Sequence, residues 1–333
     1  MKKLFLSLVA LTMATMSYAQ SNLVATLIHE GEVSVFHGSN SLKNALAAAD
    51  HGDIITLAGG RYNAGTITKA ITLRGAGIED DDTSTGASRT QIVGDFGIDI
   101  PETNERLMIE GIYHDNKMSF WNSKTLNNAI LQKCRLRNVY SDSYNNKPIY
   151  SLTIIQCNIT GYFQLPAYTN SSAKFINSIV TAPRSSSDGY NGNMEFTNCV
   201  ILGSVAGVHQ SYFQNCILNV SDKLSSTNMA SYCAGYTSDS SGSPFASLAT
   251  QATNKVLTQE QMNALFKDDT FYELTDEAKA EYVGIDGKEI GIYGGNLPYE
   301  TRILSPQITK CNVAAKTTAD GKLSVDIEVK AAE

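Results

Sequence analysis

The part of the chain best supplied with ionisable side chains runs from Pro101 to Tyr150. Twelve of these fifty residues are charged and seven of them are basic. The candidates for acid–base chemistry in this region are His114, Lys133, Arg135 and Arg137. The candidates for ligand binding are Trp121, Arg137 and Tyr140, because aromatic rings stack on sugar rings and guanidinium groups bind carboxylates. A second interpretation stays open, in which this region is a solvated surface with a Glu110–Lys133 ion pair and a packed Trp121.

The next hundred residues, Ser151–Thr250, contain only seven charged side chains. Acid–base catalysis needs titratable groups that are close together, and this stretch has few to offer. His37-Gly38 and His51-Gly52 lie near the N-terminus without a neighbouring pair of aspartates, so we interpret both as turns. The sequence therefore favours a protein without catalytic activity.

Metal and cofactor chemistry has weak signals. The acidic run from Glu79 to Asp82 could bind calcium through oxygen ligands, but it lacks the fixed spacing of a calcium loop. We expect a solvated turn there, no resident metal and no cofactor. The cysteines are expected to be buried free thiols rather than zinc ligands or nucleophiles.

The spacing of the cysteines shows a repeat. Five of the six stand at positions 134, 157, 199, 216 and 233, and Ser178 occupies the midpoint of the longest interval. The residue three before each position is mostly apolar, as is the residue two after it, and asparagine precedes three of the positions. A further step of 23 residues toward the N-terminus reaches Gly111. This alignment predicts that His114 and Arg137 stack on neighbouring coils and point outward, and that Glu110 and Lys133 stack at the bend.

A short strand, a bend and another strand explain this unit. Cysteine and the residue two beyond it share one face of a strand, and asparagine accepts the left-handed conformation that a bend requires. Strands repeated about every twenty residues are typical of a solenoid. The pattern at 41–50 predicts a helix with Ser41 as its N-cap, lying over the open end of the stack. Two more short helices are expected to begin near Thr258 and Thr275, and Asp320-Gly321 predicts the turn of a C-terminal hairpin.

Three segments carry a resemblance to a known family. The segment GDIITLAGGRY, followed by ITKAITLRGAG, resembles the opening coils of right-handed parallel β-helix proteins of the pectin-lyase-like superfamily. The F-x-N-C-x-I units are similar to their asparagine-turn coils, and DGKEIGIYGG is similar to their last coil. The resemblance covers about Ser41 to Asn296 and implies an all-β, right-handed parallel β-helix solenoid with an N-terminal capping helix and a short C-terminal β-hairpin tail. Members include lyases, hydrolases, esterases, epimerases and adhesins, and no catalytic motif of the family occurs here.

The ends of the chain predict its location and its segments. Lys2 and Lys3, a short apolar stretch and small residues before Gln20 are typical of a secretory signal peptide cleaved near Ala19-Gln20. We expect a signal peptide at 1–19, the β-helix at 20–253, a helical segment with the final coil at 254–297, and a linker with the hairpin at 298–333. The formal charge of −7 argues against a nucleic-acid partner, and no further apolar run is long enough to span a membrane.

These observations give one main hypothesis and two others. The main hypothesis is a secreted, periplasmic or cell-surface protein that binds a polysaccharide or a cell-surface glycan, or serves as a structural module, without catalysis. The first alternative is a lyase or hydrolase acting on an acidic polysaccharide, with its site around His114, Lys133, Arg135 and Arg137. The second is an adhesin that uses loop aromatics to bind a partner protein.

Overall fold

The computed structural model describes residues 23–79, 89–101, 105–121, 126–141, 148–165, 171–184, 193–268, 270–301, 307–313, 321–322 and 325–330. The chain divides into two compact units, Met1–Thr301 and Arg302–Glu333. The predicted signal peptide and the acidic residues Asp80–Asp82 lie outside the described residues. Within the described part of the chain, no helix is long and apolar enough to cross a membrane.

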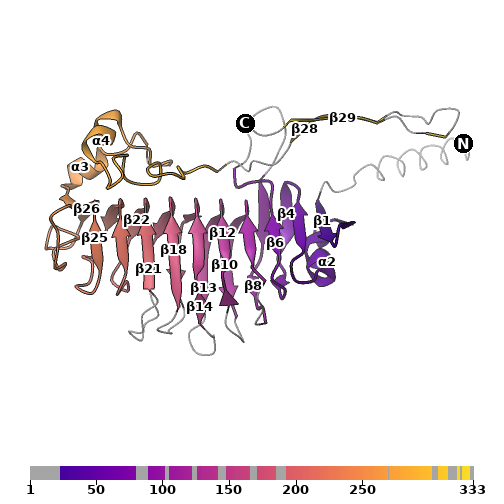
Figure 1. The fold of residues 1–333 in the computed structure, drawn as a ribbon, viewed down its shortest axis with the longest axis horizontal. Helices are drawn as coiled ribbons and strands as arrows, with labels where there is room; N and C mark the ends of the chain where they lie inside the picture. Colours follow the sequence, from indigo (N-terminus) through magenta and orange to yellow (C-terminus); the bar gives the residue numbers. More distant parts are fainter. Residues whose placement is uncertain are drawn as a thin grey trace, which may run out of the picture. The chain divides into compact units, whose positions relative to one another are not determined.

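The first unit is a parallel β-solenoid whose successive coils add strands to two long sheets (Figure 1). In these two sheets the described pairings are parallel, except that β1 pairs antiparallel with both β2 and β3. The eleven-stranded sheet has the order β2 (Glu32–His37), β1 (Val24–His29), β3 (Ile54–Leu57), β6 (Thr72–Arg74), β9 (Met108–Glu110), β12 (Ile130–Gln132), β15 (Leu152–Ile155), β18 (Ser172–Ile176), β21 (Asn193–Thr197), β23 (Tyr212–Gln214) and β25 (Met229–Ser231).

The chain passes from the eleven-stranded sheet to the fourteen-stranded sheet at a bend in the coil. The main path of the fourteen-stranded sheet is β27 (Lys255–Val256), β26 (Ala234–Thr237), β24 (Ile217–Val220), β22 (Val200–Gly203), β19 (Ile179–Thr181), β16 (Asn158–Ile159), β13 (Arg135–Ser141), β10 (Tyr113–Phe120), β7 (Thr90–Val93) and β4 (Gly60–Asn63). A branch beside it contains β5 (Thr66–Ile67), β8 (Phe96–Ile98), β17 (Phe163–Gln164) and β20 (Pro183–Arg184). Two short strands, β11 (Leu126–Asn127) and β14 (Ile149–Tyr150), pair separately.

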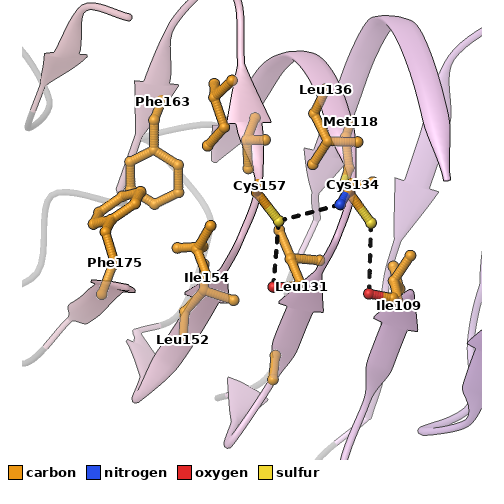
Figure 2. Packing of buried hydrophobic residues seen from close by; sticks show 14 of the residues in the cluster. Ile109, Met118, Leu131, Cys134, Leu136, Leu152, Ile154, Cys157, Phe163 and Phe175 are labelled. Carbon is orange, nitrogen blue, oxygen red and sulfur yellow. Dashed lines mark hydrogen bonds between the residues drawn. The ribbon is translucent and has the colours of Figure 1, made fainter. Parts of the chain in front are cut away.

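Like residues stack inside the solenoid, as the repeat predicts. One ladder of paired residues on the eleven-stranded sheet is Ile109, Leu131, Ile154, Phe175, Phe196 and Phe213. Phe196 lies between Phe175 and Phe213 with ring centroids 4.6 and 4.7 Å apart and nearly parallel planes. Figure 2 shows part of this core around Leu131, Ile154 and the corner cysteines. Stacked apolar ladders bury surface in every coil, which stabilises the fold without a globular core.

The corner between the two sheets explains the repeat. Asn177, Asn198 and Asn215 have φ values of 46°, 51° and 54°, which confirms the predicted left-handed bend. The residue after each of these asparagines is Cys or Ser. At three corners of the described coils the side chain at this position, in Cys157, Ser178 and Cys233, accepts a hydrogen bond from a backbone N–H of the coil before. Cys157 Sγ accepts from the N–H of Cys134 at 3.4 Å (Figure 2), and Ser178 Oγ accepts from that of Cys157 at 3.1 Å. A small hydrogen-bonding side chain therefore satisfies a backbone donor that the bend leaves without a strand partner.

The register of the first repeat differs from the sequence prediction. The bend before Lys133 is at Gly111, with φ 67°, so this step is 22 residues rather than 23. Consequently Tyr113 pairs with Arg135, and His114 pairs with Leu136 on the inner face. His114 is 1% exposed, so the prediction that it stacks on Arg137 and points outward is wrong. The predicted Glu110–Lys133 pair is also wrong, because Glu110 pairs with Gln132 and its carboxylate binds Arg74 at 3.1 Å.

The N-terminal helix is present, with a different start. Helix α2 (Ser41–Ala48) buries Leu42, Ala45 and Leu46 in the same hydrophobic cluster as the first coils. It lies beside β1 at the N-terminal end of the stack (Figure 1). Ser41 is the first helical residue rather than the N-cap, and its buried hydroxyl has no hydrogen-bond partner among the described residues.

The segment after the last coil folds back along the outside of the solenoid, as the orange part of Figure 1 shows. Helices α3 (Gln259–Asn263) and α4 (Asp276–Glu281) begin after Thr258 and Thr275, whose hydroxyls accept hydrogen bonds from the first turn, as predicted. The stretch expected to be the final coil adds no strand to either long sheet. Instead, its backbone forms hydrogen bonds with the residues at the bends. The N–H of Gly291 donates to the carbonyl of Asn215, and the side-chain amide of Asn177 donates to the carbonyls of Ile292 and Gly294.

The second unit is the predicted C-terminal hairpin. Strands β28 (Gln307–Val313) and β29 (Val325–Lys330) pair antiparallel. The innermost pair is Val313 with Val325, so the connection spans 314–324 and is longer than a two-residue turn at Asp320-Gly321.

The five cysteines of the repeat are buried free thiols, as expected.

Candidate functional site

One outward-facing row of residues changes character along the solenoid. We call it the outer ladder; it consists of Arg61, Gln91, Tyr113, Arg135, Asn158, Ile179, Val200, Ile217, Ala234 and Lys255. The members as far as Asn158 are polar or aromatic. The four from Ile179 to Ala234 are apolar and at most 2% exposed, although they point away from the solenoid core. The outer face is therefore open in the first coils and covered in the later ones.

The cover is the segment that folds back. Leu257, Met262, Leu265, Ile290 and Ile292 form a second hydrophobic cluster with the apolar half of the outer ladder. Gly291 allows the close approach: it has φ 82°, and a Cβ on it would lie 2.7 Å from Cδ1 of Ile217. Gly295 makes a similar approach, since a Cβ on it would overlap Nδ2 of Asn198, so these two glycines of the segment DGKEIGIYGG allow contact with the solenoid.

The open half carries basic groups stacked on tyrosine rings. The guanidinium of Arg89 lies 4.0 Å from the ring centre of Tyr113, with that of Arg135 at 5.7 Å. Farther along β10 and β13, the ammonium of Lys117 lies 4.2 Å from the ring of Tyr140. Such contacts hold long cationic side chains in place while their polar ends face water.

The second row continues over two more coils. Tyr140 and Tyr162 meet edge to face at 6.0 Å, and the guanidinium of Arg184 lies 4.2 Å from the ring of Tyr162. Lys117 and Arg184 form no ion pair with another described residue. A cation therefore stands at each end of a tyrosine pair, available to an anionic ligand.

Trp121 extends this row toward the N-terminus. A Cβ on Gly97 would lie 3.0 Å from Cζ3 of Trp121, so the indole lies directly against the backbone of that glycine. The Trp121 side chain is nevertheless 44% exposed. We call Trp121, Lys117, Tyr140, Tyr162 and Arg184 the aromatic strip. Its rigid backing and exposed ring suit stacking on a sugar.

The four residues proposed for acid–base chemistry do not converge. Arg135 and Arg137 lie on the outer face of β13, Arg137 being exposed. Lys133 is 6% exposed at the bend, where its φ is 50°. His114 is inside the solenoid, where Nδ1 lies 2.9 Å from the carbonyl oxygen of Ile92 and the ring packs edge to face on Phe96. Of the three ligand-binding candidates, Arg137 and Trp121 are exposed and Tyr140 is partly exposed; Arg137 and Tyr140 lie on β13, and Trp121 directly follows β10.

Sequence reasoning missed several members of these rows. Arg89, Tyr113, Tyr162 and Arg184 are not among the candidate site residues that the sequence gives. They could have been found only from the correct register of the coils.

A separate polar pair joins His29 Nδ1 to Asp53 at 2.9 Å, and this hydrogen bond raises the pKa of His29. No group of three or more potential metal-binding side chains occurs in the described ranges.

A cleft of about 400 Å³ lies where the open and covered halves of the outer face meet. Its floor comes from β13, β16, β19 and β22, and its wall comes from the returning segment. The lining residues are Glu79, Arg135, Asn158, Thr160, Ile179, Thr181, Leu202, Thr270, Phe271, Tyr272, Tyr299 and Thr301. Burial raises the pKa of the Tyr299 hydroxyl, so this side chain stays protonated at neutral pH.

Comparison with protein-family models, with curated proteins and with solved structures finds no match to this chain. The functional argument therefore depends on the geometry of the two outer-face sites.

Proposed function

We propose that the protein is a secreted or cell-surface glycan-binding module without catalytic activity, and that the glycan lies along the aromatic strip. The observation that carries this proposal is Trp121, held against Gly97 and exposed on the same outer face as the Tyr140–Tyr162 pair. The right-handed β-helix of the pectin-lyase-like superfamily, with α2 as the cap of its open end, is the family that the sequence pattern favours.

The strip has the chemistry that carbohydrate binding requires. Ring faces stack on the apolar faces of pyranoses, and Lys117 and Arg184 would bind carboxylates or sulfates at the two ends of the tyrosine pair. Lys117 lies on β10 and Arg184 on β20, three coils apart in the order β10, β13, β17, β20. A chain of sugars running parallel to the solenoid axis would contact both cations.

Absence of catalysis is proposed from the placement of the candidate residues. A lyase or hydrolase needs a base and an acid within hydrogen-bond reach of one bond. His114 faces the interior and Lys133 occupies the bend, so two of the four candidates do not reach the strip. Export after cleavage near Ala19-Gln20 would place the strip where extracellular polysaccharides occur, and mass spectrometry of the exported chain would test it.

Binding to a panel of neutral and acidic polysaccharides tests the proposal. Trp121→Ala should weaken binding about tenfold or more, because the stacking platform is lost. Phe271→Ala is the matched control, since Phe271 is also an exposed aromatic, 51% accessible, but lies at the cleft. Ultraviolet detection of unsaturated uronate products and a reducing-sugar assay should remain flat. Turnover by the wild type, or unchanged binding by Trp121→Ala, would contradict the proposal.

A further inference from the structure

The cleft at the end of the cover has a different chemistry from the aromatic strip. Its floor is amphipathic along the solenoid axis. Arg135 and Asn158 occupy neighbouring positions of the outer ladder, and Ile179 follows them on the next coil. Two residues farther along the same strands, Thr181 on β19 is followed by Leu202 on the next coil. A ligand lying in the cleft along this axis would meet polar groups at one end and apolar groups at the other.

Both charge signs stand at the polar end. Arg135 and Glu79 line the cleft, and neither forms an ion pair with another residue in the part of the chain that the structure describes. Tyr299 also lines the cleft, and both charges act on its hydroxyl: Glu79 raises the pKa of this group and Arg135 lowers it. A guanidinium and a carboxylate that face one cleft without pairing with each other can bind complementary groups of one ligand.

The apolar end is aromatic on one side and aliphatic on the other. Phe271 and Tyr272 come from the returning segment, and Ile179 and Leu202 come from the sheet. Phe271 is 51% exposed, which is unusual for a phenylalanine beside a hydrophobic cluster. The volume of about 400 Å³ lies in the lower range of small-molecule sites and is too small for a long stretch of polymer.

We propose that this cleft binds a small zwitterion with an apolar body, of the size of an apolar amino acid or dipeptide. Arg135 binds the carboxylate, Glu79 binds the ammonium group, and Phe271 with Leu202 packs on the apolar side chain. This site lies apart from the aromatic strip and does not depend on glycan binding.

Calorimetric titration of the full chain with leucyl-phenylalanine, with its N-acetyl derivative and with its C-terminal amide tests both charge contacts. The free dipeptide should bind the wild type about tenfold more tightly than either blocked form. Arg135→Gln should remove the preference for the free acid over the amide and keep the preference for the free amine. Glu79→Gln should do the opposite.

Two controls separate this site from other effects. Arg137→Gln changes an exposed arginine two residues along the same strand and should leave all three affinities unchanged. Trp121→Ala, which breaks the aromatic strip, should also bind the dipeptides normally. The proposal is overturned if folded wild-type protein binds none of the three compounds, if all three bind equally well, or if neither Arg135→Gln nor Glu79→Gln alters the preference.

Discussion

The two halves of the outer ladder differ although the solenoid beneath them is the same. In the coils as far as Asn158 the outward positions carry charged, amide or phenolic side chains, and basic groups rest on tyrosine rings. In the coils from Ile179 to Ala234 the same positions are apolar and buried under the returning segment. The inner ladders continue through both halves without such a change. The interior is therefore alike in both halves, whereas the outer face is open in one half and covered by a segment of the same chain in the other.

The largest expected effect comes from placing a charge under the cover. Val200→Asp would bury a carboxylate without a partner at a site that is 0% exposed, which should cost at least about 3 kcal/mol in the free energy of unfolding. Asn158→Asp, two coils away on the same ladder and beside Arg135, should change it by less than about 1 kcal/mol. Urea unfolding followed by circular dichroism measures both. Equal losses would show that the cover contributes nothing to stability.

The next effect concerns the bend residues beneath the cover. Asn215 holds the left-handed bend, and its side-chain oxygen also accepts a hydrogen bond from the N–H of Ile285 at 3.1 Å. Asn215→Ala should lose about 2–3 kcal/mol, since it removes this acceptor and places alanine at positive φ. Asn128→Ala is the matched change at an exposed left-handed residue, with φ 51°, and should lose about 1 kcal/mol. Identical unfolding midpoints for the two variants would contradict this role of Asn215.

A smaller effect should be the same in both halves, because it concerns the interior. Cys157 Sγ accepts from the N–H of Cys134 in the open half, and Cys233 Sγ accepts from that of Cys216 in the covered half. Cys157→Val or Cys233→Val removes the acceptor and leaves a buried backbone donor unsatisfied. Each change should lower the free energy of unfolding by about 1–2 kcal/mol. Serine should cost less than valine at both positions, since Ser178 makes the same contact naturally. A clear difference between the two sites would mean that the cover also acts on the interior.

The smallest effect is a dependence of the cover on pH. Lys267 and Lys279 donate hydrogen bonds to Glu273 and lower its pKa to about 2. Because the pKa in the folded state lies below the ordinary value, ionised Glu273 stabilises the fold at neutral pH, and this contribution is lost as pH falls from about 4.5 to about 2. Acidification over this range should therefore lower the melting temperature of the wild type more than that of Glu273→Gln. Parallel melting curves for the two proteins would exclude the contribution.

Much of the fold was predictable because the repeat is a local pattern. Each coil has the same requirement at its corner, which is a residue that tolerates positive φ followed by a small hydrogen-bonding side chain. The first coil was misaligned by one residue because Gly111 serves as its bend and Ile112 replaces the cysteine. In a strand, a shift of one residue moves a side chain to the opposite face, and this is why His114 was placed outside.

The candidate site was predictable in part. Trp121, Arg137 and Tyr140 do lie on the outer side, but their neighbours Tyr162 and Arg184 come from coils farther along the chain. Pairs such as Arg184 with Tyr162 depend on coil lengths, which vary with the loops and leave no periodic signal. The cleft was not predicted at all, because its wall comes from residues more than a hundred positions after Arg135.

By itself the sequence determined the solenoid, the left-handed asparagine bends, the buried thiols and the starts of α3 and α4, because each depends on residues within one repeat or one helical turn. Only the tertiary structure decided which side of the chain His114 faces, where the outer face is covered and where the cleft forms. These features depend on the register between coils and on a segment that returns across several of them. Contacts of that kind have no fixed spacing in the sequence, and the packed chain alone defines them.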